Sequence, residues 1–203
     1  MRVLRCADSG VLIELDGLAA VQALHAALAA DPPDGVTDLV PAARTLLLRL
    51  DPRRADIAEV ERAVRATRPR SGQHRVNELV QVPVVYDGAD LAEVARLTGL
   101  TEREVVAAHT TGEWTVAFGG FAPGFGYLVG GDDRLQVPRR GESRTAVPPG
   151  SVGLAGRFSG IYPRNSPGGW QLIGRTDLPI WRLDRDPPAL LRPGVRVAFH
   201  EIG

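Results

Sequence analysis

The chain has 203 residues, of which 44% are hydrophobic and 24% charged, and its 24 basic and 24 acidic side chains leave no formal net charge. This composition suits a globular protein with a sizeable core and argues against a strongly basic nucleic-acid-binding protein. The sequence contains no lysine, so every residue in the basic count is an arginine. A Schiff-base enzyme, a Walker A phosphate loop and a Ser–Lys hydrolase are therefore excluded, because each needs a lysine.

The first third of the chain predicts a small α+β domain over residues 1–77. A strand at 10–15 precedes an amphipathic helix that Asp16 is placed to cap. One short and one stronger strand follow within 36–51, and a second amphipathic helix covers 55–67. Alternating strands and helices of this size pack as two layers.

The cysteine content and the hydropathy pattern indicate the cellular compartment in which the protein is expected. The single cysteine, Cys6, permits neither an intrachain disulfide nor a thiolate metal cluster, and in its apparent strand we expect a buried, unreactive thiol. The first residues lack the pattern of a signal peptide, and no apolar run reaches the length of a membrane span. We expect a cytoplasmic protein that does not contact a membrane.

The segment after residue 77 begins with a strand at 78–86, and Pro83 within it predicts an edge strand or a bulge. Two short amphipathic helices follow near 90–109, joined by a turn at Gly99. They predict an αα-hairpin inserted into the second domain.

The same two helices have the outline of a DNA-binding helix-turn-helix. Thr101 and Glu104 form a capping box that starts the second helix. A recognition helix would present several Arg, Asn or Gln side chains to base edges, whereas this one offers only Arg103. We therefore favour a plain αα-hairpin and predict no nucleic-acid partner.

From residue 112 onward, glycine and proline separate many short apolar segments. Short apolar segments separated by turn residues are typical of the strands of a β-barrel or sandwich. With the strand at 78–86 they predict an all-β second domain over residues 78–203, apart from the helical insertion.

Five unusual fragments follow one another in this half of the chain. They are "GFAPGFGYL" (120–128), "VPRR" (137–140), "VPPGSVGLAG" (147–156), "GIYPRNSPGGWQLIGRT" (160–176) and "LRPGVRVAFHEI" (191–202). This ordered set resembles the KipI family, also called the 5-oxoprolinase B subunit (PxpB) family, allophanate hydrolase subunit 1 or the carboxyltransferase C/D domain. The resemblance covers essentially the whole chain, with departures at Ser143 and Asp177, where a proline is expected.

The resemblance implies an α+β fold: a small N-terminal α+β domain followed by a cyclophilin-like β-barrel. It implies work with a homologous KipA-type protein as the C subunit, together with a LamB/YcsF-type protein as the A subunit, in a complex that uses ATP to convert 5-oxoproline to glutamate. The chain alone is then expected to be inactive, with ATP bound at the partner or at the shared interface and no metal site in this chain. The barrel resembles cyclophilin in shape only, so no proline isomerase activity follows.

Two other activities are compatible with the resemblance. Related domains of urea carboxylase transfer a carboxyl group to urea, so a carboxyltransferase acting on urea-like amides is one alternative. A non-catalytic inhibitor of a sensor histidine kinase is the other. An amidase mechanism is rejected, because the chain has no lysine and Ser151 in "PGSVG" does not fit a G-x-S-x-G elbow.

Within these motifs we assign candidate catalytic roles to His109, Arg139 and Arg175. Opening a stabilised lactam with ATP needs donors around a phosphoryl group, and arginine donates to phosphate and carboxylate in a bidentate manner. His109 is the one plausible acid–base group near the signature. Structural alternatives stay open: ion pairing for the arginines, and a cation at a helix C-terminus for the histidine.

Candidate substrate-binding residues come from the same fragments. Arg164 supplies charge, and the glycines of the set could direct backbone amides at an anion. The tyrosines and Trp170 are expected to form barrel core or pocket wall, and Phe118, Phe121 and Phe125 are expected to anchor the turn at 118–128 by packing. The full set is Phe121, Pro123, Gly124, Phe125, Tyr127, Tyr162, Arg164, Gly168, Gly169 and Trp170.

Overall fold

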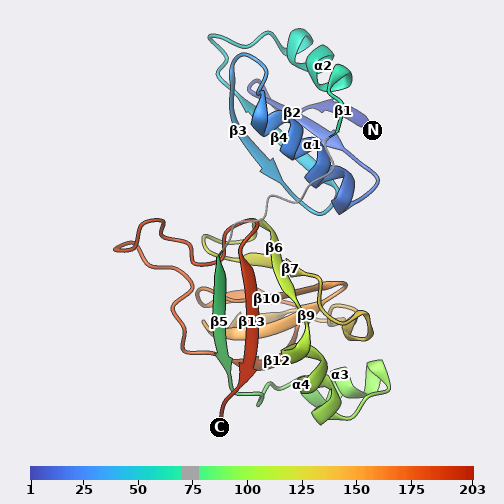
Figure 1. Cartoon of the computed structure of the whole chain (residues 1–203), viewed down its shortest axis with the longest axis vertical. Coiled ribbons are helices and arrows are strands. Elements are labelled where there is room, and N and C mark those ends of the chain that lie inside the picture. Colours follow the sequence, from blue (N-terminus) through green and yellow to red (C-terminus); the bar gives the residue numbers. More distant parts are fainter. Residues whose placement is uncertain (70–77) are drawn as a thin grey trace. The chain divides into compact units, whose positions relative to one another are not determined.

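The computed structural model describes residues 1–69 and 78–203 (Figure 1). The chain divides into two compact units, an N-terminal unit of residues 1–74 and a barrel unit of residues 75–203. The domain boundary predicted after residue 77 falls at the edge of the segment outside the described residues.

The N-terminal unit is a four-stranded antiparallel sheet with two helices. The strands lie in the order β1-β2-β4-β3. The elements are β1 (Arg2–Arg5), β2 (Gly10–Glu14), α1 (Leu18–Ala30), β3 (Val36–Pro41), β4 (Thr45–Leu50) and α2 (Ile57–Ala66). Alternate residues of β2 and β4, including Ile13 and Leu48, are buried with the apolar faces of both helices, such as Leu24 and Val64. The predicted two-layer α+β unit is confirmed.

Two local predictions in this unit are wrong. Cys6 is exposed, because β1 ends at Arg5 and the chain then turns, with the Cys6 amide donating to the Gly10 carbonyl at 2.8 Å. Helix α1 begins without a side-chain cap, since Gly17 and not Asp16 occupies the N-cap. Only α2 has the expected kind of cap, in which the Asp56 carboxylate accepts from the amide of Ala58.

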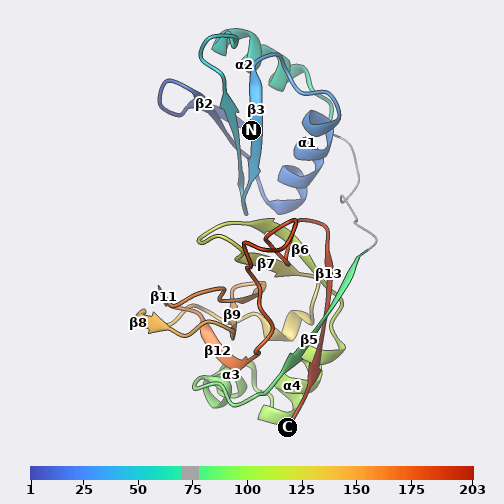
Figure 2. The same ribbon diagram turned by 90° about the vertical axis from the view of Figure 1, so that its left-hand side faces the viewer.

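The barrel unit is built on a seven-stranded sheet in the order β12-β9-β10-β7-β6-β13-β5, with a separate two-stranded antiparallel sheet of β8 and β11 that Figure 2 shows beside it. Its elements are β5 (Leu79–Val84), α3 (Leu91–Thr98), α4 (Glu102–Thr111), β6 (Trp114–Gly119), β7 (Gly126–Val129), a short 3-10 helix (Asp133–Leu135), β8 (Arg144–Val147), β9 (Ser151–Ala155), β10 (Phe158–Ile161), β11 (Ser166–Gly168), β12 (Gln171–Arg175) and β13 (Arg196–Glu201).

The sheet curls until its two end strands nearly meet. Strand β5 pairs in parallel with β13, and just beyond β5 Val85 forms an antiparallel bridge with Arg175 at the end of β12. Pro83 lies in β5, which is an end strand of the sheet, so the edge-strand prediction is confirmed. The predicted fold class, an α+β unit followed by a β-barrel, is confirmed by this nearly closed sheet.

The αα-hairpin covers one end of the barrel, close to the C-terminus (Figures 1 and 2). Gly99 ends α3 in the left-handed conformation (φ 71°), and Thr101 and Glu104 form the predicted capping box of α4. Helix α3 packs against β12 and helix α4 against β13. The hairpin is therefore part of the barrel's packing, with its apolar faces directed at the sheet.

The barrel core is continuous with the inner face of this hairpin. Buried side chains of α3 and α4, among them Val94 and Val105, share one cluster with Val82, Leu128 and Ile173 of the sheet. Among the described helices, none is both long and apolar enough to cross a membrane.

Candidate functional site

The signature loop, residues 120–125, joins β6 to β7 and is fixed by an aromatic cluster. The cluster consists of Phe118, Phe125, Tyr127, Phe158, Tyr162 and Trp170. The Phe125 ring, which is 2% exposed, contacts Tyr127, Tyr162 and Trp170 edge-on at centroid distances of 5.1 to 5.4 Å. The structure thus brings together four of the predicted substrate-binding aromatics, as a packed wall.

Phe121 does not belong to the interior of this wall, so the expectation that it anchors the turn by packing is wrong, whereas Phe118 and Phe125 are buried as expected. Its side chain is 54% exposed and meets the rings of Phe125 and Tyr162 in T-shaped arrangements at centroid distances of 5.3 and 6.0 Å. Its backbone has φ 65°, a left-handed conformation that is costly for a bulky residue. The loop therefore presents an aromatic ring to the outside in a strained conformation.

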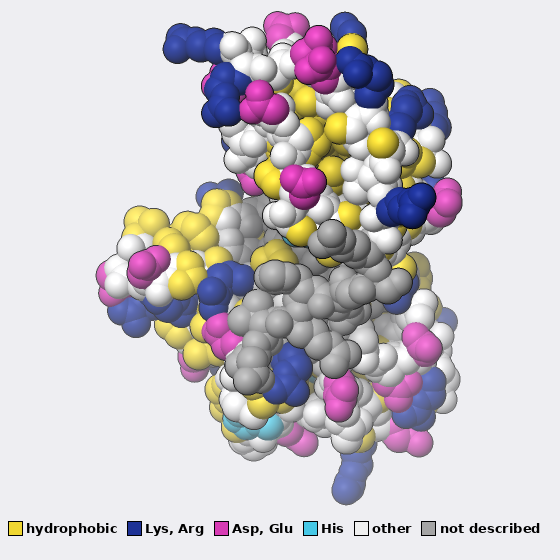
Figure 3. Space-filling model, turned by 45° about the horizontal axis from the view of Figure 1, so that its top comes forward, with side chains coloured by type: hydrophobic (Ala, Val, Ile, Leu, Met, Phe, Trp, Pro, Cys, Tyr) yellow, Lys and Arg dark blue, Asp and Glu magenta, His cyan; other side chains and the backbone are white. Residues whose placement is uncertain are grey.

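An open groove of about 490 Å³ runs beside the signature loop, lined by residues 119–125 on one side and 189–193 on the other, with Arg192 as its charged member. Pro123 and Gly124 form part of its wall. Trp181, which lies next to Gly124 and is 37% exposed, adds an apolar side chain beside this groove, and Leu183, two residues further along the same segment, is 84% exposed. Figure 3 shows such side chains on the segment that projects to the left, after β12 in Figure 1.

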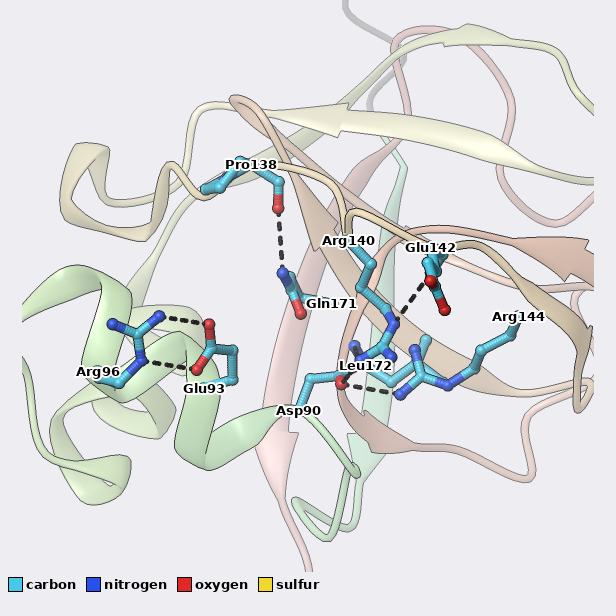
Figure 4. A network of polar contacts seen from close by, with 9 residues as sticks. All are labelled: Asp90, Glu93, Arg96, Pro138, Arg140, Glu142, Arg144, Gln171 and Leu172. Carbon is cyan, nitrogen blue, oxygen red and sulfur yellow. Dashed lines mark hydrogen bonds and ion pairs between the residues drawn. The ribbon is translucent and has the colours of Figure 1, made fainter.

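A second feature, the arginine–aspartate cluster, lies where α3 meets β12 (Figure 4). Asp90, immediately before α3, is 3% exposed and accepts three hydrogen bonds. Arg140 and Arg144 donate to Oδ1 at 2.6 and 2.8 Å, and the Leu172 amide donates to Oδ2 at 2.7 Å. One buried carboxylate therefore ties helix α3, strand β12 and the turn before β8 together.

The charges of this cluster do not balance. Burial alone would raise the pKa of Asp90, but the hydrogen bonds from Arg144 and the Leu172 amide and the charges of both arginines outweigh it and hold this pKa below its ordinary value. A single negative charge thus faces two arginines. One nitrogen of Arg144, Nη1, is buried without a hydrogen-bond partner.

The α3 groove opens next to this cluster. It has a volume of about 290 Å³ and is lined by Glu93, Leu97, Pro138, Arg139, Arg140, Gly141 and Gln171. Glu93 is held by Arg96 through two hydrogen bonds of 2.7 and 2.8 Å (Figure 4). Arg139 is exposed and forms no hydrogen bond or ion pair with the described residues.

Arg139 also has an electrostatic effect on two tyrosines of the aromatic cluster. Burial raises the pKa of Tyr127 and of Tyr162, and the nearby charge of Arg139 opposes both shifts. The guanidinium group therefore lies within electrostatic range of the phenol groups that the signature loop packs against. Among the arginines predicted from the motifs, Arg139 lines the α3 groove.

The other predicted arginines lie elsewhere. Arg175 forms an exposed ion pair with Asp87 at 2.9 Å, where β12 meets the end of β5. Arg164 is exposed in the turn after β10, and its carbonyl accepts from the Ser166 hydroxyl. The structure brings neither to the α3 groove, and their predicted roles stay predictions.

Gly168 and Gly169 allow two segments to approach closely. A Cβ on Gly168 would lie 2.3 Å from the Tyr162 hydroxyl oxygen, and one on Gly169 would lie 2.8 Å from the Ser143 hydroxyl oxygen. Gly168 is in strand β11, and the Gly169 carbonyl accepts from the Arg140 amide at 2.8 Å. Their predicted use as amide donors to an anion is not tested by this packing.

His109 lies inside the barrel, 0% exposed. Its Nδ1 is 2.7 Å from the Tyr86 hydroxyl, its Nε2 is 2.9 Å from the Ser159 hydroxyl, and its ring lies 4.2 Å from that of Phe199. Burial lowers the pKa of His109 to about 3, so the ring is neutral at pH 7. A cation at the end of α4 is therefore the wrong interpretation, and a catalytic role for this ring stays a prediction.

The burial of His109 predicts a pH-dependent stability. The unfolded chain takes up a proton on this ring below about pH 6.5, whereas the folded chain does so only near pH 3, so stability falls as the pH drops from 6.5 towards 3. At pH 5 the loss amounts to about 2 kcal/mol relative to pH 7. Denaturation at pH 7, 6 and 5 should show a flatter dependence in His109→Gln and an unchanged one in the exposed control His200→Gln. Equal slopes in wild type and His109→Gln would contradict this account.

Sequence reasoning missed Asp90, Arg140, Arg144 and Gln171. Arg140 and Gln171 lie within quoted motifs, "VPRR" and "GWQLIG", and Asp90 precedes a predicted helix, so it read as an ordinary helix start. Their association depends on contacts between residues 33 to 82 positions apart. The pair of arginines in "VPRR" did carry a signal. Adjacent residues of an extended segment point to opposite sides, so Arg139 and Arg140 could be expected to have different surroundings.

Comparison with known proteins agrees with this architecture. Residues 1–191 match the family model "Carboxyltransferase domain, subdomain C and D". The B subunit of 5-oxoprolinase from Escherichia coli O157:H7 is 44% identical over 158 residues, which are 76% of this chain and 72% of that protein. The protein of the same name from Bacillus subtilis (strain 168) is 47% identical over 127 residues, 61% of this chain and 53% of that one.

Solved structures and a longer relative extend the comparison. The crystal structure of TTHA0988 in space group P212121 superposes with a TM-score of 0.78 at 36% identity, over 96% of this chain and 40% of that one. The structure of the Pyrococcus horikoshii protein PH0987 gives a TM-score of 0.59 at 33% identity, over 99% of this chain and 97% of that one. Urea amidolyase of Saccharomyces cerevisiae is 42% identical over only 65 residues, 30% of this chain and 4% of that protein.

Proposed function

Because the chain belongs to the carboxyltransferase domain C and D family, and within it is similar to proteins named as the B subunit of 5-oxoprolinase, we propose that it is the B subunit of an ATP-dependent 5-oxoprolinase. The observation that carries this proposal is the 44% identity over 158 residues, within a match of the family model to residues 1–191. The aligned segments cover 72% and 53% of the two relatives, so the activity of the complete relatives comes to this chain as a proposal.

The residues of the α3 groove favour the binding of a small anionic substrate. Arg139 and Arg140 line it. Arg140 and Arg144 share the single carboxylate of Asp90, Arg96 pairs with Glu93, and Arg139 forms no ion pair with the described residues. An excess of guanidinium groups favours a carboxylate, which arginine binds with paired hydrogen bonds. 5-Oxoproline carries one carboxylate on a five-membered lactam ring.

ATP fits this groove poorly. A volume of about 290 Å³ is at the small end of ligand pockets and suits one small ring better than a nucleotide. The larger groove beside the signature loop is mainly apolar, and its Arg192 is already paired with Glu78, which makes it a poor triphosphate site. We therefore propose that ATP is held by the partner protein or at the shared interface, where its cleavage would drive the uphill opening of the lactam.

The partners proposed are a homologous KipA-type protein and a LamB/YcsF-type protein, the C and A components of the complex, and the chain alone is proposed to be inactive. The exposed apolar side chains around the signature loop, Phe121, Trp181 and Leu183, support association with another protein, since exposed aromatic and aliphatic side chains are enriched at interfaces. We also propose a cytoplasmic location.

Reconstitution with the products of neighbouring genes tests this function. The complete complex is expected to release phosphate from ATP only when 5-oxoproline is present, and omission of this chain should reduce the release to background. The urea amidolyase match over 65 residues supports a carboxyltransferase as the second candidate. Phosphate release that responds to urea and bicarbonate, with a biotin-carrying partner, and that ignores 5-oxoproline would establish the second and reject the first.

A further inference from the structure

We propose that the α3 groove is the site at which this chain binds the ring acid itself: Arg139 takes the carboxylate, and the side-chain oxygen of Gln171 accepts a hydrogen bond from the amide N–H of the ligand ring. The ligand class is a small cyclic carboxylic acid with an amide N–H in the ring. The choice of 5-oxoproline as the probe rests on the proposed function, whereas the site follows from the groove.

Gln171 supplies the first observation. It is 4% exposed, lines the groove, and its Nε2 donates to the Pro138 carbonyl at 3.2 Å. A carbonyl oxygen can only accept, so this bond fixes which end of the side-chain amide points to Pro138. Oε1 is left buried without a hydrogen-bond partner, between Glu93 and the arginine–aspartate cluster (Figure 4).

A buried acceptor without a partner is costly and is rare in folded proteins. A ligand that offers an N–H donor at this point would satisfy it. A fully deprotonated inorganic anion such as sulfate, with acceptor oxygens only, would leave it unsatisfied or repel it. Gln171 therefore adds a requirement for a donor to the requirement for a negative charge.

Arg139 supplies the second observation. It lines the same groove and forms no hydrogen bond or ion pair with the described residues, whereas Arg96, Arg140 and Arg144 are each held by a carboxylate. Arg140, held by Asp90 and with its amide bound to the Gly169 carbonyl, fixes the backbone next to Arg139. Arg139 is thus the cation left available for a ligand, on a segment whose position the cluster determines.

The need for both a negative charge and an N–H donor predicts that the groove distinguishes a lactam acid from the corresponding lactone acid. 5-Oxoproline and its lactone counterpart, 5-oxotetrahydrofuran-2-carboxylate, differ only in that ring N–H is replaced by oxygen. Both can place a carboxylate at Arg139, but the lactone would set an acceptor against Gln171 Oε1. Leaving a buried polar group unpaired is heavily penalised, so we expect the lactam to bind at least about tenfold more tightly.

The experiment is a titration of the full chain, alone and in its reconstituted complex, by isothermal calorimetry with three probes: 5-oxoproline, the lactone acid and inorganic phosphate. Arg139→Gln should weaken both ring acids about tenfold or more. Gln171→Met should weaken the lactam and abolish the preference over the lactone. Arg196→Gln, the same change at an exposed arginine of β13, is the matched control and should bind like wild type.

Equal affinity for lactam and lactone in the wild-type chain overturns the proposal without recourse to any variant. A second outcome would also overturn the proposal: the groove binds phosphate but neither ring acid, and this binding is lost in Arg139→Gln and kept in Gln171→Met. The groove would then be a general anion site. Absence of ring-acid binding in an active complex would reject this site and leave the proposed function standing. If the complex binds the lactam with the predicted preference but shows no 5-oxoproline-dependent ATP hydrolysis, the site is supported and the proposed function is rejected.

Discussion

Replacing Asp90 with asparagine is expected to destabilise the barrel unit by about 3 kcal/mol, the lower end of the range for breaking a buried ion pair. The carboxylate is 3% exposed and binds two arginines and one backbone amide, so loss of its charge leaves Arg140 and Arg144 uncompensated. The value lies at the lower end because the side chains of Arg140 and Arg144 remain 35% and 22% exposed.

Asp87→Asn is the matched control, because Asp87 lies three residues earlier and pairs with Arg175 while both are about half exposed. Exposed pairs of this kind contribute about 0–1 kcal/mol. Chemical denaturation followed by tryptophan fluorescence reports on the barrel unit, which contains all three tryptophans, Trp114, Trp170 and Trp181. An Asp90→Asn variant no less stable than Asp87→Asn would show that the cluster does not hold α3 to the sheet.

Replacing Gly124 with valine is expected to reduce the activity of the reconstituted complex about a hundredfold or more, the scale of loss caused by small misplacements in a site. Gly124 has φ +85°, which a β-branched residue rarely adopts, and its added Cβ would lie 2.9 Å from Cβ of Trp181. The signature loop would have to move, and with it Phe125, which packs against Tyr127 and Tyr162.

Gly156→Val separates backbone strain from displacement of the loop. Gly156 also has a positive φ, +56°, but no atom lies within 4 Å of the added Cβ. We expect this control to lose some thermal stability and to keep its activity in the complex. Wild-type turnover by a folded Gly124→Val variant would mean that the signature loop serves only as scaffold.

Local patterns were sufficient for much of the fold. Thr101 and Glu104 placed the start of α4, Gly99 the end of α3, and Pro83 an edge strand, because caps and breakers act through atoms a few residues apart. Cys6 and Phe121 were misplaced for a related reason. Their burial depends on where a strand ends or a loop turns, and an apolar neighbourhood in sequence does not settle it.

The candidate site was only partly predictable. Arg139 and the aromatic wall follow from the motifs, since both lie in the fragments that carry the resemblance. Asp90 and Gln171 depend on contacts across the fold: Asp90 meets the Leu172 amide from 82 residues away, and Gln171 meets the Pro138 carbonyl from 33. No spacing rule connects such positions, and the buried, unpartnered oxygen of Gln171 is visible only in three dimensions.

Glutamate formation from 5-oxoproline by the reconstituted complex, measured with and without this chain, tests the central claim most directly. We predict that glutamate appears together with ATP hydrolysis when the chain is present and falls to background when it is omitted. Glutamate formed at the same rate without the chain, or none formed by the complete complex, would contradict this prediction.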